Sequence, residues 1–94
     1  MRIRFTETAL AEVEEILSYM AERNPKAAIE IAETLQDTFA WILARPKASP
    51  IVYSPNVRAK LVGRFQYRVF YELAGGELIV RNVRSTRRQR PWEE

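Results

Sequence analysis

The chain has 94 residues, of which 47% are hydrophobic, and a net charge of +3. This length and apolar content suit a single globular domain with a modest core. The absence of cysteine and histidine excludes a disulfide framework and a thiolate nucleophile, and removes the commonest metal ligand and general base. We therefore expect no metal and no cofactor. No apolar run approaches the ~20 residues that span a bilayer, and no signal peptide is visible, so we expect a cytoplasmic protein without membrane contact.

The charge is unevenly distributed along the chain. Residues 51–94 hold nine Lys and Arg against four Asp and Glu, whereas residues 1–50 hold six against eight. A basic half of this kind indicates an anionic or nucleic-acid partner, although ordinary solubility also explains it.

The first elements are a short strand and a helix. Residues 2–5 alternate basic and apolar side chains, which predicts a strand. Thr6 is a suitable N-cap, and apolar residues then recur every three or four positions. The pattern predicts an amphipathic helix over residues 7–23.

A second helix is predicted at residues 25–44, because Asn24 caps well and Pro25 suits the first helical position. So short a connection predicts an antiparallel hairpin. The outward positions of both helices carry carboxylates that we interpret as solvated: Glu12, Glu14, Glu15, Glu22, Glu30, Glu33 and Asp37.

The second half of the chain reads as a loop, three strands and a basic tail. Prolines and serines predict a loop at residues 46–56. Period-two alternation then predicts strands at 57–62, 67–73 and 77–84. Gly75-Gly76 is a tight-hairpin signal between the last two. The tail, residues 85–94, has no periodicity.

These elements predict a two-layer α+β domain that occupies residues 1–94. The order is strand, helix, helix, strand, strand, strand, and the sheet has four mainly antiparallel strands. The helical hairpin covers one face of the sheet, because neither layer can bury its apolar side alone.

The alternation further predicts an open, basic sheet face. Val57, Ala59 and Leu61 would face the core and Arg58 and Lys60 the open side. The same reasoning places Arg68, Phe70, Ile79, Arg81 and Val83 on the open side. A face that carries apolar side chains among its cations is expected to meet a partner. Nucleic acid is one possibility, since arginine and lysine suit phosphate oxygens.

Two long segments resemble a known family. AEVEEILSYMAERNPKAAIEIAETL and YRVFYELAGGELIVRNVRSTRRQRPW are similar to the ParE/RelE superfamily of type II toxin–antitoxin toxins. The resemblance covers nearly the whole chain in the order of elements above. The long second helix after Pro25 favours the ParE, or plasmid stabilisation, branch.

The ParE resemblance implies a non-enzymatic growth inhibitor. Toxins of this branch poison DNA gyrase and are neutralised by a cognate ParD-like antitoxin, with which we expect a hetero-oligomer. The basic end of the chain is the expected target-binding region, namely Arg84, Arg87, Arg88 and Arg90.

The RelE branch is the alternative, and it implies a ribosome-dependent mRNA endoribonuclease. Its basic positions correspond to Arg58, Lys60, Arg68 and Arg88. RelE-like toxins often have a late tyrosine or histidine, whereas this tail offers Trp92. At residues 83–86, where many relatives read V-x-H-G, both the histidine and the glycine are missing. These departures favour ParE and imply no catalytic residues. A third possibility is a non-toxic relative that retains only partner binding.

The resemblance also implies a surface for the antitoxin, which typically lays a helix and an extended segment over its toxin. Trp41 lies off the main apolar stripe of its helix, and is either part of this surface or a core residue at the rim of the hairpin. The full expected set is Trp41, Arg58, Arg68, Phe70, Ile79, Arg81, Val83 and Trp92.

Overall fold

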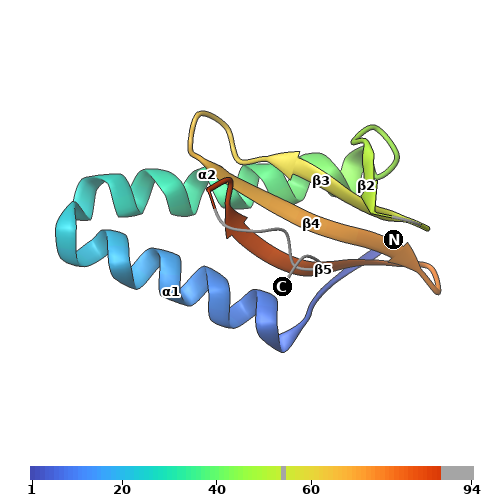
Figure 1. Cartoon of the computed structure of the whole chain (residues 1–94), viewed down its shortest axis with the longest axis horizontal. Coiled ribbons are helices and arrows are strands. Elements are labelled where there is room, and N and C mark those ends of the chain that lie inside the picture. Colours follow the sequence, from blue (N-terminus) through green and yellow to red (C-terminus); the bar gives the residue numbers. More distant parts are fainter. Residues whose placement is uncertain (54, 88–94) are drawn as a thin grey trace.

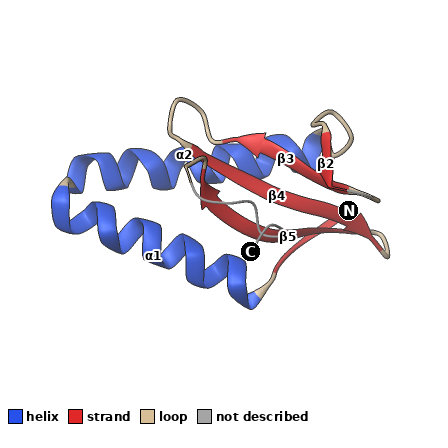
Figure 2. Cartoon of the chain, in the orientation of Figure 1, coloured by secondary structure: helices blue, strands red, loops and turns tan. Residues whose placement is uncertain are grey.

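The computed structural model describes residues 1–53 and 55–87. Two helices form one layer and the strands form the other (Figures 1 and 2). In chain order the elements are β1 (Arg2–Phe5), α1 (Glu7–Arg23), α2 (Pro25–Ala44), β2 (Ile51–Tyr53), β3 (Val57–Leu61), β4 (Tyr67–Ala74) and β5 (Glu77–Ser85).

Both helices begin at the caps that the sequence indicates. The Thr6 side chain accepts a hydrogen bond from the backbone N–H of Ala9 at 3.0 Å. The Asn24 side chain does the same for Ala27 at 3.2 Å, with Pro25 in the first turn of α2. Each cap satisfies one of the N–H groups that a helix start leaves without an intrahelical partner.

The predicted α+β class and helical hairpin are confirmed, but the sheet has five strands rather than four. Their order is β1-β5-β4-β3-β2, with β1 parallel to β5 and the other pairs antiparallel. The additional strand, β2, lies within residues 46–56, which were predicted to be a loop. It was missed because it has only three residues, is flanked by prolines and pairs irregularly with β3.

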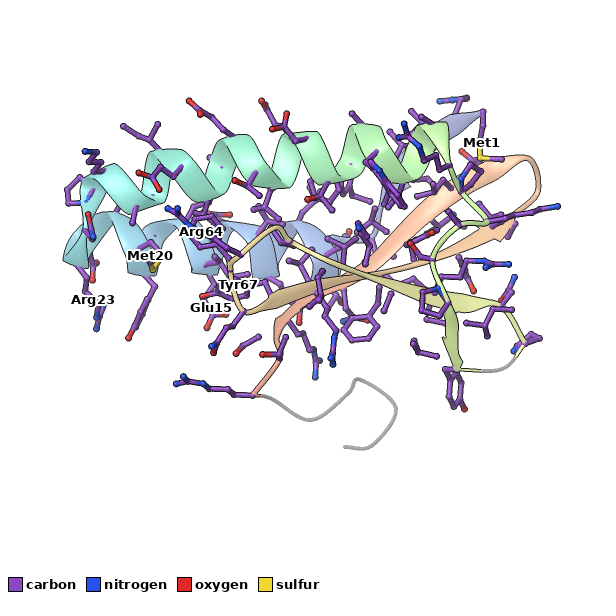
Figure 3. All side chains as sticks on the ribbon, turned by 90° about the horizontal axis from the view of Figure 1, so that it is seen from above. Met1, Glu15, Met20, Arg23, Arg64 and Tyr67 are labelled. Carbon is purple, nitrogen blue, oxygen red and sulfur yellow. The ribbon has the colours of Figure 1, made fainter. Side chains whose placement is uncertain are left out.

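The core lies between the helical hairpin and one face of the sheet. Figure 3 shows the helices along one side of the strands. Gly75 and Gly76 join β4 to β5 with φ of 58° and 75°, as a tight hairpin turn requires. The buried cluster contains Ala9, Ile31, Leu35, Ile42, Val62, Val69, Tyr71, Leu78, Val80 and Val83.

A bulge in β5 reverses the alternation of its side chains. Phe70 is opposite Asn82, but the next residue, Tyr71, is opposite Val80, so Arg81 is the extra residue. Beyond the bulge, Val83 therefore joins the core and is 1% exposed. Its predicted position on the open face is wrong, since uninterrupted alternation was assumed.

The orientation predicted for β3 is also wrong. Residues directly opposite each other in an antiparallel pair share a sheet face. Lys60 is opposite the buried Val69 and Arg58 is opposite the buried Tyr71, so both cations lie on the helix side. Alternation shows which residues of a strand share a face, but it does not show which face packs against the helices.

No described helix is long and apolar enough to cross a membrane.

Candidate functional site: the sheet edge beside Trp41

Trp41 stands near the end of α2 and is contacted by two cations. The Lys60 ammonium lies 4.2 Å from the centre of its ring, and the Arg45 guanidinium lies 5.2 Å from it. Both distances are within the range of cation–π attraction. Trp41 is half-buried and also packs against the core cluster. The sequence left open whether Trp41 is a core residue or part of a surface, and in the structure it has both roles.

The loop between α2 and β2 is fixed by side chains from the sheet. Arg58 Nη1 donates to the backbone carbonyls of Lys47 at 3.1 Å and Ser49 at 2.6 Å. The Tyr71 hydroxyl donates to the carbonyl of Pro46 at 2.9 Å. Arg58, predicted as a site cation, therefore anchors this loop.

A cavity of about 370 Å³ opens where β2 leaves the edge of β3. Lys60 and Trp41 line it from the helix side, and Arg68 and Phe70 line it from the opposite face of the sheet. Three predicted antitoxin contacts, Trp41, Arg68 and Phe70, are thus brought together. The remaining lining residues are Ala48, Ser49, Pro50, Val52, Ala59 and Leu61.

Ser49 is the polar residue of this cavity that sequence reasoning missed. It is 3% exposed, and its hydroxyl has no hydrogen-bond partner within residues 1–53 and 55–87. A buried hydroxyl without a partner costs about 1–3 kcal/mol. A serine in a proline-rich loop gave no signal that it would be buried.

The predicted open face is largely closed at its apolar positions. Phe70 is 4% exposed and Ile79 is 7% exposed. Ile79 lies between Arg4 and Glu72 in the register of the sheet. Arg81 keeps its predicted position on this face, where its guanidinium pairs with Glu72 at 2.8 Å. This region therefore offers charged pairs to a partner rather than an apolar surface.

Glu12 was predicted to be a solvated carboxylate, but it accepts hydrogen bonds from three groups of β5. Its Oε1 accepts from the backbone N–H of Val83 at 3.0 Å and from Asn82 Nδ2 at 3.1 Å. Its Oε2 accepts from Arg84 Nε at 2.9 Å, and the two side chains are 12% and 10% exposed. The hydrogen-bond network lies on β5 just beyond the last residue that pairs with β1. The burial of Arg84 argues against its predicted role in target contact.

Beside this network lies a second cavity of about 360 Å³, between α1 and the ends of β4 and β5. Glu15 and Tyr67 lie at this end of the molecule in Figure 3, and Tyr19 and Arg87 also line the cavity. Arg87 is exposed, as its predicted role in target binding requires. The other predicted tail residues, Arg88, Arg90 and Trp92, lie outside the described residues.

The three RelE-type cations that the structure describes lie near the edge cavity but in different settings. Arg58 is hydrogen-bonded to loop carbonyls, and Lys60 lies over Trp41 on the helix side. Arg68 lies on the opposite face of the sheet, although it reaches the same edge cavity as Lys60. The fourth position, Arg88, is outside the described residues. Within the described residues there is also no group of three or more side chains of the types that bind metals.

The architecture is a helical hairpin packed on one face of a five-stranded sheet. It superposes with a TM-score of 0.79 on a solved chain titled "Chromosomal ParDE TA system from P. aeruginosa". The two chains are 17% identical, and the match covers 90% of this chain and 95% of the other. No curated protein matches the sequence. The family model described as "ParE toxin of type II toxin-antitoxin system, parDE" matches residues 3–90. The chain therefore belongs to the ParE toxin family.

Proposed function

We propose that this chain inhibits DNA gyrase in the cytoplasm and is neutralised by a ParD-like antitoxin encoded beside it. Membership of the ParE family is the observation that carries this proposal. It is supported by the engagement of Arg58 with the carbonyls of Lys47 and Ser49, because cleavage of RNA requires charges and a proton acceptor that are free to converge on one phosphodiester. The chain also has no histidine to act as general base.

The antitoxin is proposed to bind across the sheet edge beside Trp41. The cavity there joins apolar walls to cations, which suits an acidic segment with apolar side chains. Binding makes the toxin one member of a hetero-oligomer and covers a surface that would otherwise remain open.

The test is a pair of assays with the purified toxin. One follows supercoiling and cleavage of plasmid DNA by gyrase, and the other follows cleavage of mRNA on programmed ribosomes. We expect linear plasmid to accumulate while the mRNA stays intact. Cut mRNA with normal supercoiling would overturn the proposal in favour of the ribonuclease, and Arg68→Ala would then be the first variant to examine. No effect in either assay, and no growth arrest on induction, would identify a non-toxic relative.

A further inference from the structure

The cavity at the sheet edge has the chemistry of a carboxylate-binding site. We propose that it binds an acidic side chain of the antitoxin, with the carboxylate between the Lys60 ammonium and the Ser49 hydroxyl and the neighbouring apolar side chains against Trp41 and Leu61. This inference rests on the proposed function and adds to it the position of a charged contact.

Ser49 provides the first observation. Its hydroxyl is buried, lines the cavity and lacks a hydrogen-bond partner in the part of the chain that the structure describes. The backbone carbonyl of the same residue is held by Arg58, so the position of Ser49 is fixed. Buried hydroxyl groups in proteins are normally hydrogen-bonded. An acceptor from a partner would satisfy this requirement once the Ser49 hydroxyl, which is buried in the free toxin, turns toward the cavity.

The distribution of ion pairs provides a second, independent observation. Four described arginines pair with carboxylates of other elements or strands, namely Arg4 with Glu77, Arg64 with Glu30, Arg81 with Glu72 and Arg84 with Glu12. Lys60 and Arg68 are among the described cations that have no such carboxylate, and both line this cavity. Among the described residues, the cavity therefore combines two cations that lack a carboxylate partner with one hydroxyl that lacks an acceptor.

The walls favour a peptide over a nucleic acid. Phe70, Leu61, Pro50 and Val52 make most of the lining apolar and concave, which suits side chains of an extended segment. The Trp41 ring already carries Lys60 and Arg45 within cation–π distance. A ring occupied in this way is poorly placed to stack a base, which is the usual role of an aromatic side chain in single-strand binding.

The edge of β3 leaves room for such a segment. β2 pairs with β3 at Val57 and Arg58 and leaves before Leu61, whose side chain is exposed. An extended chain that lies beyond β2 would pass directly over the cavity. Lys60 would then exchange part of its contact with the indole ring for a charge-assisted hydrogen bond to the carboxylate.

Tryptophan fluorescence gives a direct measurement. The chain has two tryptophans, so Trp92→Phe leaves Trp41 as the sole indole while an aromatic side chain remains at position 92. In this background we would titrate the separately purified antitoxin encoded beside the toxin. Lys60→Met removes the ammonium but keeps most of the aliphatic stem, and Ser49→Ala removes the hydroxyl. Arg64→Met is the matched control, because Arg64 is an exposed cation paired with Glu30 away from the cavity.

Binding is expected to change the Trp41 emission. Lys60→Met and Ser49→Ala should each weaken binding about tenfold or more, as expected for loss of a charged hydrogen bond, whereas Arg64→Met should not. Ser49→Ala should leave the thermal stability of the free toxin unchanged or raised, which separates loss of a ligand contact from structural damage. A double-mutant cycle that combines Lys60→Met with Asp→Asn and Glu→Gln changes in the antitoxin should locate one coupled carboxylate.

Three results would overturn the inference. Wild-type affinity in both cavity variants would show that the antitoxin does not use this site, while leaving the proposed function intact. If the cavity variants bind a DNA duplex more weakly than the wild-type toxin does, while their antitoxin binding is unchanged, the site binds a nucleic acid. If the wild-type toxin does not bind the antitoxin at all, both the proposed neutralisation and this proposed binding site are wrong.

Discussion

At the scale of single residues, Glu12 makes the most demanding set of contacts. Its carboxylate accepts hydrogen bonds from the backbone N–H of Val83 and from the side chains of Asn82 and Arg84. The sequence assigned Glu12 to a solvated helix face, because helical spacing places it beside the core stripe but gives no information about β5, 70 residues away. Local patterns cannot indicate a partner that only the tertiary fold brings near.

We predict that Glu12→Ala destabilises the toxin by about 3–5 kcal/mol, because it removes the carboxylate that pairs with the nearly buried Arg84 and accepts from Val83 and Asn82. Replacing both partners, as Glu12→Leu with Arg84→Met, should recover much of this loss. Urea denaturation measures both values. Glu15→Ala is the control, since Glu15 is exposed on the same helix. A loss below about 1 kcal/mol in Glu12→Ala would mean that the pair behaves as an exposed one.

At the scale of elements, the turn between β3 and β4 is packed closely against α2. Gly63 has φ of +51°, and a Cβ there would lie 2.9 Å from Thr34 Cγ2. Gly75 has a similar φ of +58° but has open space around it. Comparing alanine substitutions at the two glycines therefore separates the free-energy cost of a left-handed backbone from the cost of a steric clash.

We predict that Gly63→Ala lowers the free energy of unfolding by about 1–3 kcal/mol more than Gly75→Ala, because it adds overpacking to the shared backbone cost. Thermal or urea unfolding gives the difference. In a Thr34→Ser background, which removes Cγ2 but keeps the hydroxyl that donates to Glu30, the excess should disappear. An excess that persists in this background would show that Thr34 is not its cause.

Elements were more predictable than their contacts. Apart from β2, the order of strands and helices follows from local spacing, and the caps at Thr6 and Asn24 and the Gly75-Gly76 turn follow from cap and turn chemistry. The bulge at Arg81 and the orientation of β3 do not, because both depend on which residues a neighbouring strand places opposite. The candidate site was accordingly predicted in part. Trp41, Arg68 and Phe70 were named, whereas Ser49 was not.

At the scale of the whole molecule, the first strand closes one edge of the sheet. β1 lies parallel to β5, and Ile3 and Phe5 pack against the core. Beyond β1, Thr6 continues the closure: its N–H donates to the carbonyl of Val80 at 3.0 Å and its hydroxyl to that of Arg81 at 2.9 Å. β1 and Thr6 therefore cover an edge of β5 that would otherwise be exposed.

We predict that deletion of residues 1–5 increases self-association of the toxin. It removes two apolar side chains from the core and exposes backbone N–H and C=O groups of β5, which can pair with another chain. Size-exclusion chromatography with light scattering measures the change. Arg2→Ala, which alters the same strand at an exposed position, should leave the molecular mass unchanged. A deletion variant with unaltered mass and stability would contradict the prediction.

The parallel pairing of β1 with β5 joins the first and the last of the described strands to be synthesised. The ribosome synthesises β1 first and β5 last of the described elements, and Glu12 likewise finds its partners on β5. During translation the helical hairpin can form early from local contacts, whereas pairing across such a separation comes late. A nascent chain therefore carries an unfinished sheet until β5 has emerged, and the described fold of the toxin is completed only after residues 77–85 have left the ribosome.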